Sequence, residues 1–470
     1  MTDAMRRQAS FGRIKNVHMV GIGGIGMSSI AEVLLARGYR VSGSDLQASP
    51  VTERLQSLGA TIHKGHAAEQ VTDADVVVYS SAVKPGQNPE TVEAERRRIP
   101  LIRRAEMLGE LMRAKYGVGI AGTHGKTTTT SMTGLVVREG GFDPTIIVGG
   151  KVAVFDSNAV SGEGDIIIIE ADEYDRTFLR LTPIVAVVTN IEADHLDIYK
   201  DLDDLKGAFI QFANSVPFFG AAILCLDDAE VREVLGDVER RVITYGTSRQ
   251  AQVRAESLVQ DGAVTRFTVV REATPLGEVT LGVPGLHNVQ NALAAVCVGL
   301  ELDIPFAKIQ KALAGFTGVD RRFQIKGEAG DVIVIDDYAH HPTEIEATLD
   351  AAAKGWPNRR VVAVFQPHLY SRTRDFQDGF ARAFFDADVL VLTEIYGARE
   401  EPIDGVSGRM LADLTSRYGH RDVRFVPEKA DVPTYLQQVV KPGDLVITMG
   451  AGDIWKSGEA FLATLNDGEG

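Results

Sequence analysis

Residues 116–131 read YGVGIAGTHGKTTTTS, and this stretch decides the fold of the chain. The apolar run through Val118 and Ile120 predicts a strand, residues 122–125 predict a glycine turn, and the residues from Lys126 onward favour a helix. This arrangement binds phosphate, because glycines let backbone N–H groups approach phosphate oxygens and a helix N-terminus is partly positive. Lys126 is therefore expected to reach the β- and γ-phosphates of a nucleotide, and the Thr127 hydroxyl to hold Mg²⁺.

The match to the standard phosphate loop is incomplete. That pattern has a glycine five residues before Gly125, where this chain has Ile120. A glycine turn with incidental threonines is the alternative, but a Lys-Thr pair directly after glycine at a strand–helix junction argues against it. We therefore predict a variant phosphate loop that needs support from the rest of the sequence.

The bulk composition limits the class of protein. A chain of 470 residues is expected to form two to four domains, and its net charge of −15 argues against nucleic-acid or membrane-surface binding. Cys225 and Cys297 lie in apolar segments and are expected to be reduced core residues. Arg6 and Arg7 are not followed by an apolar segment, and no run approaches a membrane span. A cytoplasmic protein without membrane insertion is predicted.

Strand and helix patterns alternate along the chain, which predicts an α/β fold with parallel sheets. The first part, residues 1–114, is expected to be a Rossmann-like domain. The second, residues 115–321, carries the phosphate loop and a small antiparallel insertion at about 241–283. The third, residues 322–470, repeats the Rossmann-like pattern.

A second glycine-rich turn, GIGGIGMS, lies in the first part. Gly21, Gly23 and Gly26 satisfy G-x-G-x-x-G between a predicted strand and a predicted helix, and Asp45 ends the next strand. The motif fits NAD, or the diphosphate of a UDP-sugar at the same helix N-terminus, or a purely structural tight turn. The motif alone leaves these three interpretations open.

Acidic residues follow two buried strands of the second part. Glu170 directly follows the run DIIII, where a carboxylate takes a Mg²⁺ that bridges phosphates; a solvated acidic loop is the alternative for its neighbours. His195 follows the strand IVAVVTN in the stretch NIEADH. A histidine beside acids is usually a hydrogen-bonded loop residue, but at this strand end a second metal ligand is a reasonable hypothesis, although Mg²⁺ prefers oxygen.

Further candidate residues lie toward the C-terminus. Asn288 and Asn291 share a helix face and could read an adenine edge, with helix capping as the alternative. The arginines of Asp320-Arg321-Arg322 could meet a γ-phosphate, or form a surface salt bridge. Carboxylate, aromatic, imidazole and guanidinium groups at 336–341 and 372–374 together could hold a zwitterionic amino acid.

Taken together and in this order, these stretches resemble the Mur ligase family. The matching motifs are GIGGIGMS, GTHGKTTTT, EADE, NIEADHLD, HNVQNALAA, DRRF, DDYAHHP and QPHLYSRT, and the resemblance spans about residues 15–455. In that family the phosphate loop is written G-T-x-G-K-T, so Ile120 is no defect. The resemblance implies a first domain that binds a UDP-sugar and no NAD, a central domain that binds ATP, and a third that binds the incoming amino acid.

The resemblance also implies roles for single residues. Catalytic roles are expected for Lys126, Glu170, His195, Arg322 and Asp337, with Thr127, Glu170 and His195 as metal ligands. ATP binding is expected at Gly122, Thr123, His124, Gly125, Lys126, Thr127, Thr128, Asn288, Asn291 and Arg322. UDP-sugar binding is expected at Gly21, Gly23, Gly24, Ile25, Gly26, Ser44, Asp45, Ser80 and Ser81. Amino-acid binding is expected, as less secure matches, at Tyr338, His340, Arg372 and Arg374.

The activity implied by the resemblance is ATP-dependent amide formation. The carboxylate of UDP-N-acetylmuramate would be phosphorylated and then attacked by L-alanine, giving ADP and phosphate, with Mg²⁺, or in its place Mn²⁺, as the metal. The chain would be a monomer or a weak homodimer. The alternatives are ligation of a whole tripeptide to the same UDP-sugar, an NAD-dependent oxidoreductase, and a nucleotide-gated binding protein without catalysis.

Overall fold

The computed structural model describes residues 11–152, 157–194, 198–398 and 400–467, and the chain divides into two compact units. Unit 1 comprises Met1–Glu256, Thr268–Glu278 and Gln290–Ala314; unit 2 comprises Ser257–Phe267, Val279–Val289 and Gly315–Gly470. The chain therefore passes between the units repeatedly around residues 256–315. The predicted α/β class with parallel sheets is confirmed.

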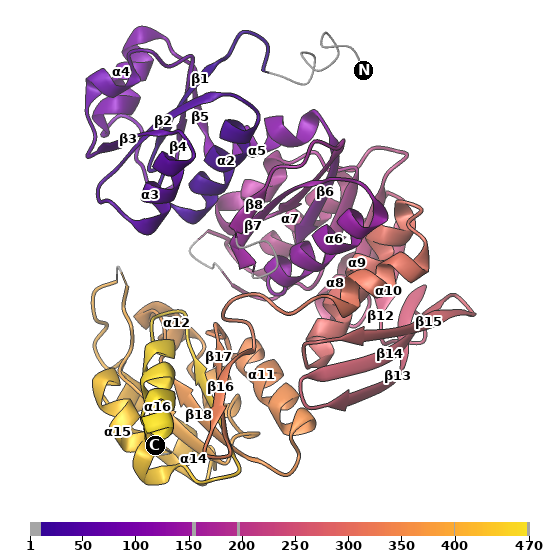
Figure 1. Cartoon of the computed structure of the whole chain (residues 1–470), viewed down its shortest axis with the longest axis vertical. Helices are drawn as coiled ribbons and strands as arrows, with labels where there is room; N and C mark the ends of the chain where they lie inside the picture. Colours follow the sequence, from indigo (N-terminus) through magenta and orange to yellow (C-terminus); the bar gives the residue numbers. More distant parts are fainter. Residues whose placement is uncertain (1–10, 153–156, 195–197, 399, 468–470) are drawn as a thin grey trace. The chain divides into compact units, whose positions relative to one another are not determined.

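The N-terminal sheet of unit 1 is parallel and has a doubly wound order (Figure 1). Its strands, in spatial order, are β3 (Thr61–Lys64), β2 (Arg40–Asp45), β1 (Asn16–Val20), β4 (Val76–Tyr79) and β5 (Leu101–Arg103). Its helices are α2 (Ile25–Ala36), α3 (Pro50–Ser57), η2 (Ala68–Val71), α4 (Pro89–Arg97) and α5 (Arg104–Arg113). The strand order reverses between β1 and β4, and ligands of such sheets bind where the order reverses. The glycine-rich turn after β1 lies at this point.

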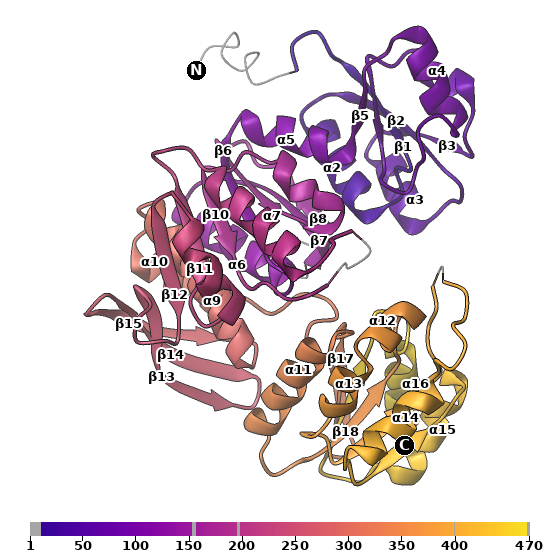
Figure 2. The same cartoon turned by 180° about the vertical axis from the view of Figure 1, so that it is seen from behind.

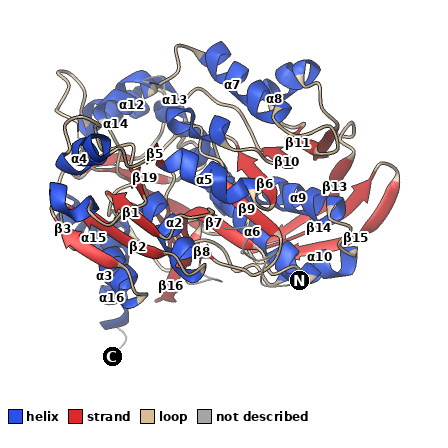
Figure 3. Ribbon diagram, turned by 90° about the horizontal axis from the view of Figure 1, so that it is seen from above, coloured by secondary structure: helices blue, strands red, loops and turns tan. Residues whose placement is uncertain are grey.

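The second sheet carries the phosphate loop; most of it lies in unit 1, whereas residues 257–261, 264–267 and 279–281 of its last three strands belong to unit 2. Its order is β15 (Thr274–Leu281), β14 (Val264–Arg271), β13 (Val253–Asp261), β12 (Val242–Gly246), β11 (Ala221–Cys225), β10 (Val185–Val188), β6 (Tyr116–Ala121), β9 (Ile166–Glu170), β7 (Thr145–Val152) and β8 (Ser157–Val160). The helical elements with it are α6 (Lys126–Gly140), η3 (Tyr174–Arg180), α7 (Leu202–Asn214), α8 (Ala229–Val234), η4 (Leu235–Asp237), α9 (Leu286–Glu301) and α10 (Phe306–Ala314). Figure 3 shows helices α6 to α10 beside these strands.

The insertion predicted at about 241–283 needs one correction. Its first strand, β12, pairs in parallel with both β11 and β13, so it continues the parallel sheet. Strands β13, β14 and β15 are joined by two-residue connections, which are too short for a parallel crossover, so these three run antiparallel. Strands β7 and β8, an antiparallel pair at the other edge, were not among the predicted strands.

The two sheets of unit 1 share one hydrophobic core. Ile30 and Val33 of α2 belong to the same buried cluster as Ile147 of β7 and Ala159 of β8. The buried run Val185–Val188 and the run Ile166–Ile169 are continuously apolar because both faces of these central strands are covered. Cys225 and Cys297 are buried and unpaired in disulfides, as predicted.

The third sheet lies entirely within unit 2 and has a separate core on each face. Its strands are β16 (Gln324–Ala329), β17 (Val332–Asp337), β21 (Asp444–Met449), β18 (Arg360–Phe365), β19 (Val389–Leu392) and β20 (Val423–Phe425), and only the β16–β17 pair is antiparallel among the described pairings. One face packs against α11 (Pro342–Gly355), α13 (Gln377–Arg382) and α14 (Gly408–Arg417), and the other against α15 (Val432–Val439) and α16 (Trp455–Asp467) (Figure 2). The remaining helical elements are α12 (Tyr370–Asp375) and η5 (Lys429–Asp431).

Across the described ranges, the helices are too short or too polar to traverse a lipid bilayer.

Candidate active site

The loops that follow three neighbouring strands meet at one edge of the second sheet. Strand β6 lies between β9 and β10, and its register pairs Ile120 with Glu170 and Ala121 with Val188. The phosphate loop, the acidic loop after Glu170 and the loop after Thr189 therefore begin side by side. Because parallel strands end at the same edge, the segments that begin at residues 122, 170 and 189 supply one site.

The phosphate loop needs glycine at two positions. Gly122 has φ +139°, and a Cβ atom there would collide with Oγ1 of Thr189. Gly125 has φ +79° and caps α6, with the side chain of Asn291 packed directly against it. These conformations and close contacts exclude larger residues at both positions, and no side chain in the described ranges caps the N-terminus of α6 by a hydrogen bond.

Lys126 is held by three groups of the protein. Its Nζ donates to the carbonyls of Gly122 at 2.6 Å and Thr123 at 3.0 Å, and contacts both carboxylate oxygens of Glu173 at 2.7 and 3.0 Å. Burial disfavours the charged form of Lys126, but Glu173, Asp172 and Glu170 together outweigh it and raise the pKa of Lys126. Lys126 is thus a cation surrounded by carboxylates.

Thr127 and Glu170 form an oxygen-donor pair beside Lys126. The Thr127 hydroxyl donates to Oε1 of Glu170 at 3.1 Å, and the Gly149 N–H of β7 donates to Oε2 at 2.7 Å. Burial raises the pKa of Glu170, against the Gly149 N–H and Lys126, which favour its ionised form. Hydroxyl and carboxylate oxygens are the donors that Mg²⁺ prefers, so this pair fits the metal that the sequence analysis expects.

The third loop secures the turn of the phosphate loop. Asn190 accepts from the His124 N–H at 2.7 Å and donates to the His124 carbonyl at 3.1 Å, while Thr189 donates to the same carbonyl at 2.6 Å. The His124 ring lies 2.9 Å from the Glu192 carboxylate. The first three contacts hold the loop through the backbone of His124, and only the contact with Glu192 involves its ring. His195, the predicted second metal ligand, lies outside the described residues.

The two asparagines of α9 have different surroundings. Asn291 accepts a hydrogen bond from Thr129 of α6 at 3.0 Å, and so links α9 to the helix that follows the phosphate loop. Asn288 donates to the Pro284 carbonyl at 2.7 Å, a contact within its own turn. Both side chains are buried, so a solvated helix cap is not their environment.

The glycine-rich turn after β1 is fixed by the end of β2. The N–H groups of Gly21 and Ile22 donate to the Ser44 carbonyl at 2.9 and 3.1 Å, and Gly23 N–H donates to Oδ2 of Asp45 at 2.9 Å. Gly24 then caps α2, which begins at Ile25. Gly26 lies against the Arg104 guanidinium, where a Cβ would collide with it. The turn therefore presents a helix N-terminus beside an arginine, which suits a diphosphate.

A buried polar cluster lies under this turn. The Ser44 hydroxyl, predicted to bind a UDP-sugar, is buried and donates to Glu90 at 2.7 Å. His18 and His66 each approach the same Glu90 carboxylate to 3.5 Å. Sequence reasoning missed Glu90; its signal is the helix start Asn88-Pro89-Glu90, where the Asn88 side chain caps α4 and directs Glu90 inward.

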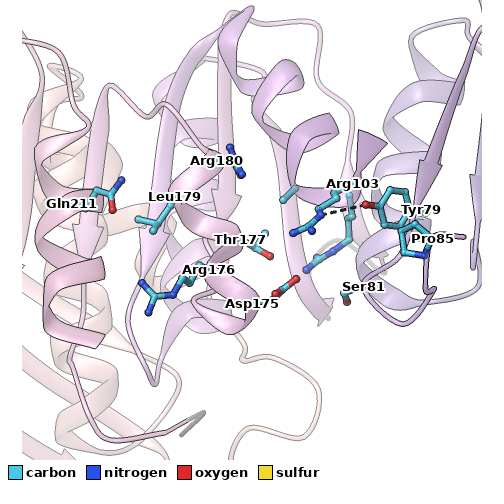
Figure 4. A pocket seen from close by; sticks show the side chains of 12 residues that line it. Tyr79, Ser81, Pro85, Arg103, Asp175, Arg176, Thr177, Leu179, Arg180 and Gln211 are labelled. Atoms are coloured by element: carbon cyan, nitrogen blue, oxygen red, sulfur yellow. Dashed lines mark hydrogen bonds between the residues drawn. The ribbon is translucent and has the colours of Figure 1, made fainter. Parts of the chain in front are cut away.

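An arginine-lined cavity of about 570 Å³ lies in unit 1 (Figure 4). The N-terminal part contributes Ser81, Arg103 and Arg104, and Arg103 donates to the Tyr79 hydroxyl at 3.3 Å. The facing wall comes from η3. The full lining is Tyr79, Ser81, Pro85, Arg103, Arg104, Ala105, Asp175, Arg176, Thr177, Leu179, Arg180 and Gln211. Four guanidinium groups against one carboxylate favour an anionic ligand. Sequence reasoning missed this cavity.

The acidic turn after β9 connects the cavity to the phosphate loop. Glu170 and Glu173 face the phosphate loop, whereas Asp172 lies 3.8 Å from Arg104 and Asp175 lines the cavity. Asp175 has φ +54°, and the next residue has φ +53°. Two consecutive non-glycine residues in the left-handed region cost free energy, and such strain concentrates at functional sites.

In unit 2, two acids end β17. Asp337 accepts from the N–H groups of Phe323 and Ala339, both at 2.7 Å, and is 6% exposed. Burial raises the pKa of Asp337 to about 6 although Arg322 and these N–H groups favour its ionised form. Asp336 pairs with Arg321 at 3.0 Å. The pKa of Asp337 is therefore raised into the mildly acidic range.

Two arginines cover one aromatic ring in unit 2. The guanidinium carbons of Arg321 and Arg322 lie 4.9 and 5.2 Å from the Tyr338 ring centroid. Arg322 also pairs with Glu344 at 3.3 Å. The Glu344 carboxylate accepts from the His340 N–H at 3.0 Å. Sequence reasoning missed Glu344, which fixes both Arg322 and His340.

Only some of the predicted amino-acid-binding residues come together. The rings of His340 and His368 are 5.9 Å apart, and Nη1 of Arg372 lies 3.4 Å from Nδ1 of His368. Burial lowers the pKa of His368 to about 4, so it is neutral at physiological pH. Arg374 is half exposed and paired with Asp375 at 2.7 Å. Glu400, also missed from the sequence, accepts from the Ser371 N–H at 3.0 Å.

The fold and these contacts define an α/β protein built around a phosphate loop, with a second glycine-rich turn in the same unit. Models of the Mur ligase family match three consecutive segments: the "Mur ligase family, catalytic domain" over residues 16–116, the "Mur ligase middle domain" over 120–299 and the "Mur ligase, glutamate ligase domain" over 321–452. The chain is 68% identical to a UDP-N-acetylmuramate–L-alanine ligase of Salinibacter ruber, over 99% of this chain and 98% of that protein. The chain belongs to the Mur ligase family.

Solved structures are similar over nearly the whole chain. A UDP-N-acetylmuramate–alanine ligase from Thermotoga maritima matches with a TM-score of 0.79 and 30% identity, covering 96% of this chain and 99% of that one. A murein peptide ligase from Psychrobacter arcticus matches with a TM-score of 0.67 and 26% identity, covering 96% and 98%.

Proposed function

We propose that the chain joins L-alanine to the lactyl carboxylate of UDP-N-acetylmuramate at the expense of ATP, and so supplies a peptidoglycan precursor. The observation that carries the proposal is the acidic turn at 170–175. It contributes Glu170 and Glu173 to the phosphate loop and Asp175 to the arginine-lined cavity. A phosphate donor and an anionic sugar nucleotide would therefore bind on either side of one short segment.

Amide formation from a carboxylate requires that one carboxylate oxygen first be converted into a leaving group. A carboxylate cannot lose oxide to an amine, so one of its oxygens first attacks the γ-phosphorus of ATP, and ADP departs. The amine nitrogen then attacks the carbonyl carbon of the acyl phosphate, the C–O bond to phosphate breaks, and the amine loses a proton. Positioning and charge neutralisation supply most of the catalysis in phosphoryl transfer, which suits a site built from loops, lysine and carboxylates.

We assign the ATP phosphates to Gly122, Thr123, His124, Gly125, Lys126, Thr127 and Thr128. The N-terminus of α6, which no described side chain caps, and the raised pKa of Lys126 support this assignment, because both keep positive charge at the loop. Thr127 and Glu170 would hold Mg²⁺, which when bound neutralises phosphate charge. Asn288, Asn291 and Arg322 stay predictions for the nucleotide, as does His195 for the metal.

We assign the UDP-sugar to the turn at Gly21–Gly26, to Asp45, Ser80 and Ser81, and to the arginine-lined cavity. Arg104 supports this assignment, since it both contacts Gly26 and lines the cavity. Ser44 would act through its carbonyl, because its hydroxyl is bonded to Glu90. The amino acid is assigned to Tyr338, His340 and Arg372, with Arg374 as a peripheral member and Asp337 as a functional acid.

We assign one substrate to each of the three predicted domains. Residues 1–114 would bind the UDP-sugar, residues 115–321 ATP, and residues 322–470 the amino acid. The cytoplasmic location and the monomeric or weakly dimeric state stay predictions.

The decisive experiment measures phosphate release from ATP by the purified chain with UDP-N-acetylmuramate and one amine substrate. L-Alanine is expected to give the highest kcat/KM, above glycine and L-serine. Phosphate release that depends on the stem tripeptide instead of L-alanine would favour the alternative activity, ligation of a whole tripeptide to the same UDP-sugar. We keep this alternative because the murein peptide ligase is similar over 96% of this chain. Release without any dependence on the UDP-sugar would contradict both.

A variant at Asp45 tests the assignment of the first glycine-rich turn. D45A removes the carboxylate that holds the Gly23 N–H, so it should weaken binding of UDP-N-acetylmuramate about tenfold or more and leave ATP binding within about twofold. Isothermal titration with each ligand separately measures both. Equal losses for the two ligands would contradict the assignment.

A further inference from the structure

All three N–H groups of the Lys126 ammonium already donate hydrogen bonds within the protein, so none is left over for a ligand. An ammonium group has three N–H donors. Two of them point at the carbonyls of Gly122 and Thr123, and the third at the Glu173 carboxylate. A nucleotide phosphate can therefore bind Lys126 only by displacing one of these acceptors. The two carbonyls belong to the loop that carries the lysine, so Glu173 is the acceptor that a phosphate would replace.

Glu173 is built into this position. Its side chain is 1% exposed, and its backbone carbonyl accepts the Tyr199 hydroxyl at 2.6 Å and the Arg176 N–H at 3.0 Å. Tyr199 is itself buried. The carboxylate is thus presented to Lys126 by a fixed backbone, which lowers the entropic cost of the ion pair compared with a pair between mobile surface chains.

We propose that Glu173 is a positioning residue that competes with nucleotide phosphate for Lys126. The Glu173 carboxylate holds the Lys126 ammonium at the phosphate loop. It also neutralises the ammonium charge, so anions that make few other contacts bind the loop weakly. A nucleotide that also gains the N–H groups of the loop and α6 replaces it. The proposal rests on the proposed function, because it assumes that the loop binds ATP and ADP.

The chain offers a matched control for charge. Asp172 precedes Glu173 in the same turn and carries the same charge, but its carboxylate is 37% exposed and lies 3.8 Å from Arg104. D172N and E173Q therefore remove equal charge from adjacent positions. Only E173Q removes a carboxylate that touches Lys126, so the difference between the two variants reports direct competition.

Calorimetric titration of the full-length chain with ADP and Mg²⁺ tests the proposal. E173Q should bind ADP at least fivefold more tightly than the wild type, and D172N should stay within about twofold. In a K126M background, E173Q should bring no gain, because the competing partner is missing. Steady-state kinetics should show a lower KM for ATP in E173Q without a higher kcat, a split that a merely damaged structure would not produce.

The outcomes separate this proposal from the proposed function. Failure of the wild type to bind ADP, or equal ADP binding by wild type and K126M, would overturn both. If binding depends on Lys126 but the gain in ADP affinity of E173Q is less than twice that of D172N, only the role of Glu173 is overturned. If E173Q does not fold, E173D decides: it keeps the charge but withdraws the carboxylate by one methylene, and it must also bind ADP more tightly than the wild type.

Discussion

At the scale of single residues, the buried ion pair between Lys126 and Glu173 means that a substitution of Lys126 affects stability as well as turnover. The sequence alone predicts that removing Lys126 abolishes turnover and leaves the fold intact. The Glu173 side chain is 1% exposed, however, so loss of Lys126 takes a neutralising ammonium away from a buried carboxylate. Breaking a buried pair from one side destabilises a protein more than removing both charges.

We therefore expect K126M to lose turnover and also about 3 kcal/mol of unfolding free energy. The double variant K126M/E173Q should recover more than half of that free energy and none of the activity. Urea denaturation followed by circular dichroism measures the stability, and phosphate release measures the activity. Equal stability of K126M and the wild type would contradict the expectation.

Asp337 gives a pH dependence with a definite sign. Its pKa is raised from 3.8 to about 6 in the folded chain, so the folded state binds its proton more tightly than the unfolded state. The stability from this group is fully present below pH 3.8 and is lost as the pH rises through about 6.

Between pH 4.5 and pH 7.5 the unfolding free energy of the wild type should therefore fall by about 2 kcal/mol relative to D337N, which cannot titrate there. Unfolding of both proteins at several pH values measures this difference. A difference that stays constant with pH would contradict the raised pKa. The absolute stability of D337N is not the readout, because one of the two Asp337 oxygens that accept from Phe323 and Ala339 N–H groups becomes an NH2 donor.

At the scale of elements, two glycines with positive φ flank helix α6, the crowded Gly122 in the loop before it and the uncrowded Gly141 at its C-terminal cap. Gly122, which precedes the helix, has Thr189 against it, whereas Gly141, which ends the helix, has φ +99° and open space around it. Both positions oppose an L side chain by conformation, but only Gly122 also opposes it by contact.

G141A should cost about 1 kcal/mol of stability and leave ADP affinity within about twofold. G122A should weaken ADP binding at least tenfold, because Thr189 or the loop backbone must move. Thermal unfolding and ADP titration of both variants separate the two effects. A G122A variant with normal ADP affinity would show that the loop tolerates the displacement.

The elements and their order could be predicted from the sequence, whereas many side-chain partners could not. Apolar runs such as DIIII and IVAVVTN indicate buried parallel strands, and glycines beside Lys126 indicate the phosphate loop. Glu173 contacts Lys126 across 47 positions, and Gly149 reaches Glu170 from a strand that was not predicted. Such contacts depend on strand order and register, which periodicity does not encode. The arginine-lined cavity was missed for the same reason, because its walls come from η3 and from the segment around Arg103.

At the scale of the whole molecule, each substrate should protect its own part of the chain from hydrogen exchange. UDP-N-acetylmuramate is expected to slow exchange at residues 21–26 and 103–105, and ADP at residues 122–127. L-Alanine is expected to act on residues 366–374 of unit 2. Mass spectrometry of peptic fragments measures each ligand alone. Protection of 366–374 by ADP alone, with none at 122–127, would contradict the assignments.

The repeated passage of the chain between its two units has a consequence for synthesis on the ribosome. Gln260 donates to the Ala351 carbonyl at 2.6 Å, and Gly262 N–H donates to the Gly355 carbonyl, both inside unit 2. The first pair is 91 positions apart, which takes roughly 5–18 s to translate at 5–20 residues per second. During that time the tip of the β13–β14 hairpin has emerged without α11. Chaperones should therefore bind most strongly to nascent chains whose translation pauses between residues 262 and 351.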